Sequence, residues 1–134
     1  MISRNKSHEY GVQILYAALV YIKNGQTFDF KAVVSEVTDV PYDKVPDTLK
    51  KILLASLSNL NEIKEALIPY LKDWRFERLN EVTQAILIYS YAHFYYVGDV
   101  SKAIVINIAI KLAKLFIPNE DFKFINALLD EALK

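Results

Sequence analysis

Hydrophobic residues recur along the chain at the three- and four-residue spacing of amphipathic α-helices. The first stripe consists of Val12, Leu15, Tyr16, Leu19 and Ile22. It predicts a helix that begins within residues 4–7 and ends at Asn24-Gly25, because glycine readily adopts the left-handed conformation common after a helix C-terminus.

The same spacing continues to the end of the chain and predicts six further helices. They cover about residues 28–37, 48–58, 61–70, 77–97, 101–116 and 120–133. The valines in 28–37 also fit a strand, and Pro69 predicts a kink or a tightened last turn. The segment 77–97 is apolar on both faces but falls short of a membrane span, so we expect a buried helix there.

The length of 134 residues and a hydrophobic content of 53% predict one compact domain over residues 1–134. Only three glycines and four prolines are present, too few for the turns of a sandwich or barrel. The predicted class is therefore all-α. Cysteine is absent, which excludes disulfides and thiolate chemistry, and the polar start lacks an apolar signal core, so we expect a cytoplasmic protein.

No sequence motif indicates catalysis. The two histidines, His8 and His93, are not in a metal-binding spacing, and neither a GxxxxGK nor a GxGxxG phosphate loop occurs. We interpret His93 as a hydrogen-bonded core or interface side chain, and His8 as an exposed neighbour of the basic start. The sequence thus predicts no enzyme, no metal and no cofactor. A pocket bringing His93 together with two carboxylates would reverse that interpretation.

The formal net charge is zero, but positive charge is modestly concentrated at the two ends of the chain. At the N-terminal end, Arg4, Lys6 and His8 precede Gln13 and Tyr16, residue types that bind phosphates and unpaired bases. The alternative is a solvated, frayed terminus. A second candidate surface is formed by Tyr91, Tyr95 and Tyr96, which are either core residues or a patch that binds a protein partner.

Several motifs resemble those of the NusB family, in the same order and at similar distances. They are Val12-Gln13-Ile14-Leu15-Tyr16, Trp74 with Glu77-Arg78-Leu79, Ala85-Ile86-Leu87, the run 105–116, and Phe124-Ile125-Asn126-Ala127-Leu128-Leu129-Asp130. The resemblance covers nearly the whole chain. It implies a bundle of about seven helices in two helical subdomains, here residues 1–72 and 73–134.

The resemblance also implies a function. Members of this family bind a short single-stranded boxA RNA together with a ribosomal protein also called NusE, and the complex acts on RNA polymerase against termination in ribosomal RNA transcription. The RNA contacts carried over by matching position are Arg4, Lys6, His8, Gln13, Tyr16, Lys123 and Phe124.

This sequence departs from the family pattern in two ways. Asn5 and Ser7 interrupt what is usually a denser arginine run, so we expect weaker phosphate contacts and a smaller salt dependence of binding. Ile88, His93 and Ile108 stand where arginine, glutamate and glutamate are common. The alternative function is therefore a protein-interaction module or homodimer with weak or lost RNA binding.

Overall fold

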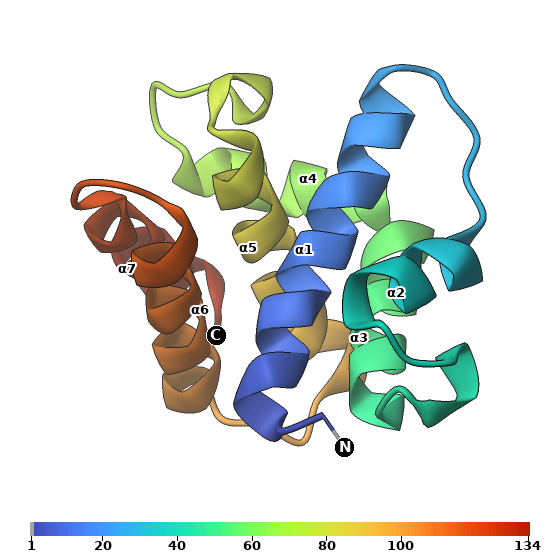
Figure 1. Cartoon of the computed structure of the whole chain (residues 1–134). Helices are drawn as coiled ribbons and strands as arrows, with labels where there is room; N and C mark the ends of the chain where they lie inside the picture. The colour runs from blue at the N-terminus through green and yellow to red at the C-terminus, as the bar shows by residue number, and fades with distance from the viewer. Residues whose placement is uncertain (1) are drawn as a thin grey trace.

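The computed structural model describes residues 2–134, and within this range it contains seven α-helices and no strand (Figure 1). The α-helices are α1 (Arg4–Lys23), α2 (Phe30–Thr38), α3 (Asp47–Ser58), α4 (Leu60–Leu67), α5 (Glu81–Ala92), α6 (Lys102–Phe116) and α7 (Asp121–Ala132). Three single 3-10 turns are η1 (Tyr42–Lys44), η2 (Ile68–Tyr70) and η3 (Phe76–Arg78), and a π-turn, η4 (His93–Val97), extends α5. The predicted all-α class is confirmed.

Short polar side chains start several of these helices. Ser3 accepts a hydrogen bond from the Lys6 amide at 3.2 Å, and Ser101 accepts one from the Ile104 amide at 3.2 Å. Each bond satisfies a backbone donor that has no partner within its helix. At the other end of α1, Gly25 has a φ of 68°. This is the left-handed conformation predicted for the glycine after the helix.

The structure differs from the predicted elements in two places. The strand alternative for 28–37 is wrong, since α2 is a regular helix. The single helix predicted over 77–97 is interrupted, because the side chain of Asn80 accepts from the Val82 amide at 2.8 Å and starts α5 there. The tightened turn predicted at Pro69 is confirmed as η2.

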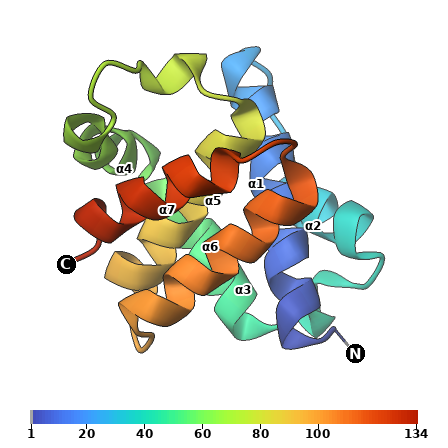
Figure 2. The same cartoon turned by 90° about the vertical axis from the view of Figure 1, so that its left-hand side faces the viewer.

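Helix α5 lies at the centre of the bundle and packs against α1, α3, α4, α6 and α7 (Figures 1 and 2). Ile86, Leu87 and Ile88 are completely buried, which confirms that both faces of this helix are covered. Because α5 contacts helices on both sides of residue 72, the predicted subdomains share one hydrophobic core. Among the described helices, none is long and apolar enough to cross a membrane.

Helices α1 and α5 approach each other closely at Gly11. A Cβ atom at this position would lie 2.5 Å from Cε2 of Tyr89 and 2.8 Å from Cδ1 of Leu49. Such distances are well inside van der Waals contact, so only glycine fits without a shift of the helices. Gly11 thereby fixes how deeply α1 is seated in the core.

Candidate nucleic-acid interface

The candidate residues of α1 are divided between two faces of the helix. Residues of an α-helix are separated by about 100°, which places Lys6, Gln13 and Tyr16 on one side and Arg4 and His8 on the other. The first three are exposed, Tyr16 by 38% of its surface. We call Lys6, Gln13 and Tyr16 the outer face of α1.

His8 is buried, not exposed as its position near the terminus led us to expect. Only 7% of its surface is accessible, and Nδ1 lies 2.8 Å from the hydroxyl oxygen of Tyr89, 81 residues further along the chain. Burial, helped by nearby His93 and Arg4, lowers the pKa of His8 to about 4. The ring is therefore neutral near pH 7 and does not supply a cation for phosphate.

His93 belongs to the same buried cluster. It is 6% exposed, and its ring centroid lies 5.5 Å from that of His8 and 6.4 Å from that of Tyr89. Burial also lowers its pKa. The predicted burial of His93 is confirmed, but its side chain forms no hydrogen bond with the residues that the structure describes. The cleft that it lines contains one carboxylate, Asp99, and no group of three potential metal ligands occurs in the described part of the chain.

The other departures from the family pattern also lie in or near the interior. Ile88 has no accessible surface, and Ile108 is partly buried. An apolar side chain at position 88 suits its surroundings, where an unpaired arginine would be strongly unfavourable. The departures at positions 88 and 93 therefore change the core of this chain, not an exposed binding surface.

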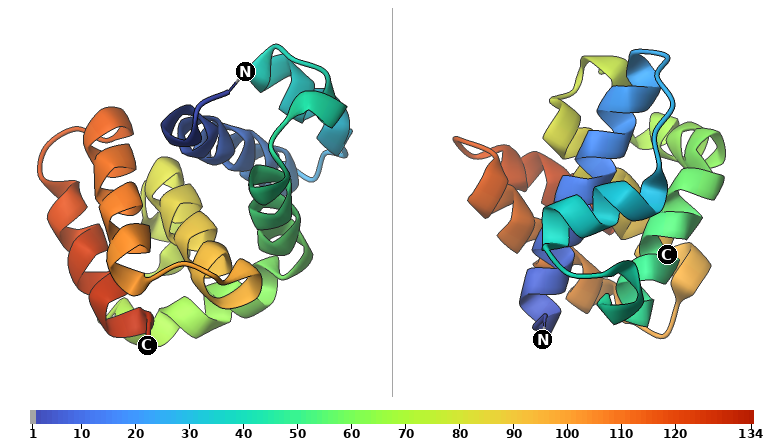
Figure 3. Two further views of the ribbon diagram at one scale, coloured as in Figure 1. Left: turned by 90° about the horizontal axis from the view of Figure 1, so that it is seen from below. Right: turned by 45° about the vertical axis from the view of Figure 1, so that its right-hand side comes forward.

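An open cleft of about 910 Å³ lies beside the first turn of α1, among α3, η4 and the start of α6. Figure 3 (left) shows α1 from below, between α6 on one side and α2 and α3 on the other. Arg4 and Lys51 contribute positive charge to the cleft, and His8 and His93 line it. Arg4 thus faces this cleft and not the outer face of α1.

The two lysines predicted to bind RNA are exposed and lightly paired. Nζ of Lys6 lies 3.9 Å from Glu9 and 5.1 Å from the ring centroid of Tyr10, whereas Nζ of Lys123 lies 3.0 Å from Glu120. Exposed ion pairs within one helical turn contribute about 0.5 kcal/mol or less. Both ammonium groups can therefore leave their acidic neighbours for a phosphate at little cost.

The RNA contacts predicted on the closing helix α7 and on the first turn of α1 do not form one continuous surface. Helix α6 lies between α7 and α1 (Figure 2). Phe124 of α7 is partly buried and lines a cleft of about 240 Å³ with Tyr70 and Trp74, a different cleft from the one lined by Arg4. The structure therefore separates Phe124 from Arg4, and no described cavity contains both.

Trp74 is a surface residue that belongs to one of the motifs resembling the NusB family. Its side chain is 60% exposed, more than any other large hydrophobic residue described. The exposure of Trp74 could not be predicted from helical spacing, because the residue lies in a loop. The presence of a single tryptophan in the chain was the only signal that drew attention to it.

The three tyrosines predicted to bind a protein partner do cluster. The rings of Tyr91 and Tyr95 are 4.7 Å apart and those of Tyr91 and Tyr96 are 6.4 Å apart. The Tyr95 hydroxyl donates to the Ala132 carbonyl at 3.0 Å and accepts from the Lys134 amide at 2.8 Å. Tyr95 therefore holds the C-terminal end of the chain, while its ring, like that of Tyr96, remains partly exposed.

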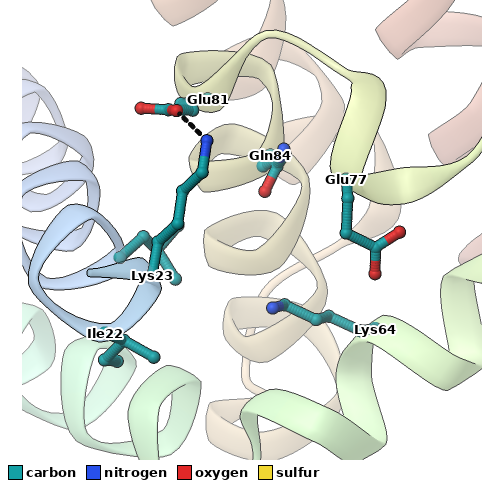
Figure 4. A pocket seen from close by; sticks show the side chains of 7 residues that line it. Ile22, Lys23, Lys64, Glu77, Glu81 and Gln84 are labelled. Carbon is teal, nitrogen blue, oxygen red and sulfur yellow. Dashed lines mark hydrogen bonds and ion pairs between the residues drawn. The ribbon is translucent and has the colours of Figure 1, made fainter. Parts of the chain in front are cut away.

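A small pocket of about 150 Å³ lies between the end of α1 and the start of α5 (Figure 4). Lys23 reaches across it and pairs with Glu81 at 2.8 Å, and this hydrogen-bonded carboxylate raises the pKa of Lys23. Lys64 and Glu77 border the pocket on its other side. Its volume is below the roughly 300 Å³ typical of ligand sites, so we interpret it as a place where the ion pair joins two helices.

These features define a small all-helical domain whose surface combines exposed cations, aromatic rings and an amide, the residue types that bind nucleic acid.

Comparison with known proteins agrees with this class. The model of the NusB family matches residues 5–134. The transcription antitermination protein NusB of Macrococcus caseolyticus is 31% identical over 99% of this chain and 98% of its own length. That of Treponema denticola is 40% identical over 81 residues, which are 60% of each chain. The chain therefore belongs to the NusB family of transcription antitermination proteins.

Two solved structures share the fold. NusB of T. maritima superimposes with a TM-score of 0.84 at 20% identity, covering 98% of this chain and 90% of the other. A chain from a crystal structure described as a plectonemic RNA supercoil superimposes with a TM-score of 0.77 at 19% identity, covering 97% and 94%. The predicted NusB-like bundle is confirmed.

Proposed function

We propose that this chain binds single-stranded boxA-like RNA through the outer face of α1, together with the ribosomal protein NusE, and so acts against termination on RNA polymerase in ribosomal RNA transcription. In this proposal the chain acts by binding and not by catalysis. It works in the cytoplasm, because RNA polymerase transcribes there. The observation that carries the proposal is the alignment of Lys6, Gln13 and Tyr16 on one exposed side of a helix that the core holds in place.

Each residue of the outer face has a suitable chemical role. The ammonium group of Lys6 binds a phosphate, the amide of Gln13 donates to and accepts from a base edge, and the ring of Tyr16 stacks on an unpaired base. Lys123 and Phe124 provide a second cation and ring on α7. Arg4 is exposed beside the open cleft, where it can reach a phosphate of a longer strand.

The low density of cations sets the expected salt dependence. For single strands, each phosphate contact lowers the logarithm of affinity by about 0.7 when the salt concentration rises tenfold. Three contacts, from Arg4, Lys6 and Lys123, predict a loss of roughly twentyfold between about 50 and 200 mM salt. A family member with a denser arginine run would lose more.

The experiment is to measure binding of a fluorescently labelled boxA-like strand at these two salt concentrations, with and without a NusE-type protein. Lys6→Glu and Lys123→Glu should each weaken binding, whereas Lys44→Glu, in the exposed turn η1, is a matched control that should not. Equal affinity of wild type and the first two variants would count against the proposal, as would no binding even with the partner present.

The tyrosine cluster supports a second candidate function, a protein-interaction surface or homodimer. Tyr95 and Tyr96 are 43% and 42% exposed, and tyrosine is enriched at the centres of interfaces. Sedimentation velocity at several protein concentrations tests this function. A concentration-dependent dimer that is lost in Tyr96→Ser supports it, and a strict monomer that also captures no NusE-type protein counts against it.

A further inference from the structure

We propose that Trp74 is a stacking platform for an unpaired RNA base, adjoining the predicted contact at Phe124. This inference rests on the proposed RNA binding and extends it to a residue outside α1 and α7. Trp74 lies in the segment between η2 and η3, and 60% of its surface is exposed. Tryptophan offers a large flat ring, and exposed aromatic rings are the side chains on which unpaired bases stack.

The surroundings of Trp74 suit a nucleotide. Trp74 lines the cleft of about 240 Å³ that also contains Tyr70 and Phe124. It also lines an open hollow of about 570 Å³ with Arg75 and Arg78. Both arginines are exposed, and neither forms an ion pair with any residue that the structure describes. Guanidinium groups bind phosphate with two parallel hydrogen bonds and also stack on bases.

The acidic residues nearby indicate how the nucleotide is oriented. Asp73 lines both hollows. The cleft on the Phe124 side also contains Glu131 and Lys72 and so has one more acid than base, whereas Arg75 and Arg78 give the other hollow one more base than acid. Carboxylates repel phosphate, so the base lies over Trp74 on the Phe124 side and the phosphate lies toward Arg75 and Arg78. The cleft is smaller than the roughly 300 Å³ needed to enclose a whole ligand, which fits a flat ring laid on the surface.

The position of Trp74 also makes the inference directly measurable, because it is the only tryptophan of the chain. A base stacked on the indole should quench its fluorescence. We expect quenching to saturate at the same RNA concentration as the anisotropy of a labelled boxA-like strand. Where a NusE-type protein is added, the same mixture with Trp74→Phe supplies the background emission.

Two variants separate stacking from proximity. Trp74→Ala should weaken RNA binding about tenfold, the typical effect of losing one stacked base, whereas Trp74→Phe should retain most of the affinity. Leu115→Ala is a matched control, since Leu115 is a 57% exposed apolar residue on α6 that lines none of the clefts assigned to RNA, and it should have no effect on RNA binding. An abasic ribose-phosphate oligomer should leave the emission unchanged.

The possible failures are distinguishable. If anisotropy shows RNA binding but the emission does not change, or if Trp74→Ala binds as tightly as wild type, the Trp74 inference is overturned and the proposed function stands. Quenching by the abasic oligomer equal to that by RNA also overturns base stacking. If wild type binds no RNA even with the partner, the proposed function fails and this inference fails with it.

Discussion

Lys6 and His8 are two positions apart on α1, yet their surroundings are opposite. Lys6 is 50% exposed on the outer face with a loose acidic neighbour at 3.9 Å, whereas His8 is packed against Tyr89 and His93. Beyond them, Gly11 closes the inner face against Tyr89, while Gln13 and Tyr16 remain exposed. The inner face thus seats the helix, and the outer face is left available for a ligand, so substitutions should affect stability on one face and RNA affinity on the other.

The largest difference in stability between substitutions on the two faces should come from Gly11→Ala on the inner face. Alanine favours a helix over glycine by about 1 kcal/mol, but its Cβ would lie 2.5 Å from the buried ring of Tyr89. The clash should dominate and lower the free energy of unfolding by about 2–3 kcal/mol, measured by urea denaturation. Gln13→Ala on the outer face is the control and should change it by less than about 0.5 kcal/mol. A stabilised Gly11→Ala would contradict the close packing of α1 on α5.

A second test uses the pH dependence of stability. An ordinary imidazole binds a proton near pH 6.5, but the folded His8 does so only near pH 4. Between these values the unfolded chain binds more protons, so the free energy of unfolding should fall as the pH is lowered through this window. The His8 contribution should approach about 2 kcal/mol, and the lowered pKa of His93 acts in the same direction.

The variant His8→Gln should flatten this dependence, because glutamine has no titrating proton but can still hydrogen-bond to Tyr89. His93→Gln is the companion variant and should retain most of the dependence. Denaturation curves at pH 7, 6 and 5 provide the measurement. A wild-type stability that stays constant over this range would show that His8 is not buried as a neutral ring.

On the outer face, Tyr16→Ala should weaken RNA binding about tenfold through the loss of one stacked base, with stability nearly unchanged. Tyr16→Phe should retain most of the affinity, since stacking needs the ring and not the hydroxyl. Fluorescence anisotropy with a labelled single strand provides the measurement. A fall in stability without a fall in affinity would place Tyr16 in the core and not in the RNA site.

The smallest effect should come from Lys6→Gln, which removes one charge from the outer face. We expect a loss of affinity of a few fold at low salt and a decrease of about 0.7 in the slope of log affinity against log salt. Lys44→Gln is the matched control. An unchanged slope would mean that Lys6 does not contact a phosphate.

The sequence was sufficient for the parts of the fold that follow from local rules. Helical spacing identified buried residues such as Val12 and Leu15, and Asn24-Gly25 marked the end of α1 because Gly25 adopts a positive φ. Family motifs then predicted the bundle. Helical spacing also put Tyr16 and Ile22 in the apolar stripe of the first helix, which is wrong, because the structure leaves them 38% and 43% exposed.

What could not be predicted depends on contacts between distant residues. The burial of His8 requires Tyr89, 81 residues away, and the close approach at Gly11 requires Leu49 and Tyr89 together. The separation of Phe124 from Arg4 follows from the position of α6 between α7 and α1. No local pattern of hydrophobic and polar residues carries this information.

The central claim, that RNA binds the outer face of α1 while the buried residues His8 and Gly11 hold the helix in the core, is tested most directly by NMR spectroscopy. A boxA-like strand is added to isotopically labelled protein, with the NusE-type partner where binding requires it, and the changes in chemical shift are mapped. We predict that the side-chain amide of Gln13 and the backbone amides of Lys6 and Tyr16 shift most on α1. Shifts centred on Tyr95 and Tyr96, with α1 unaffected, would contradict the claim.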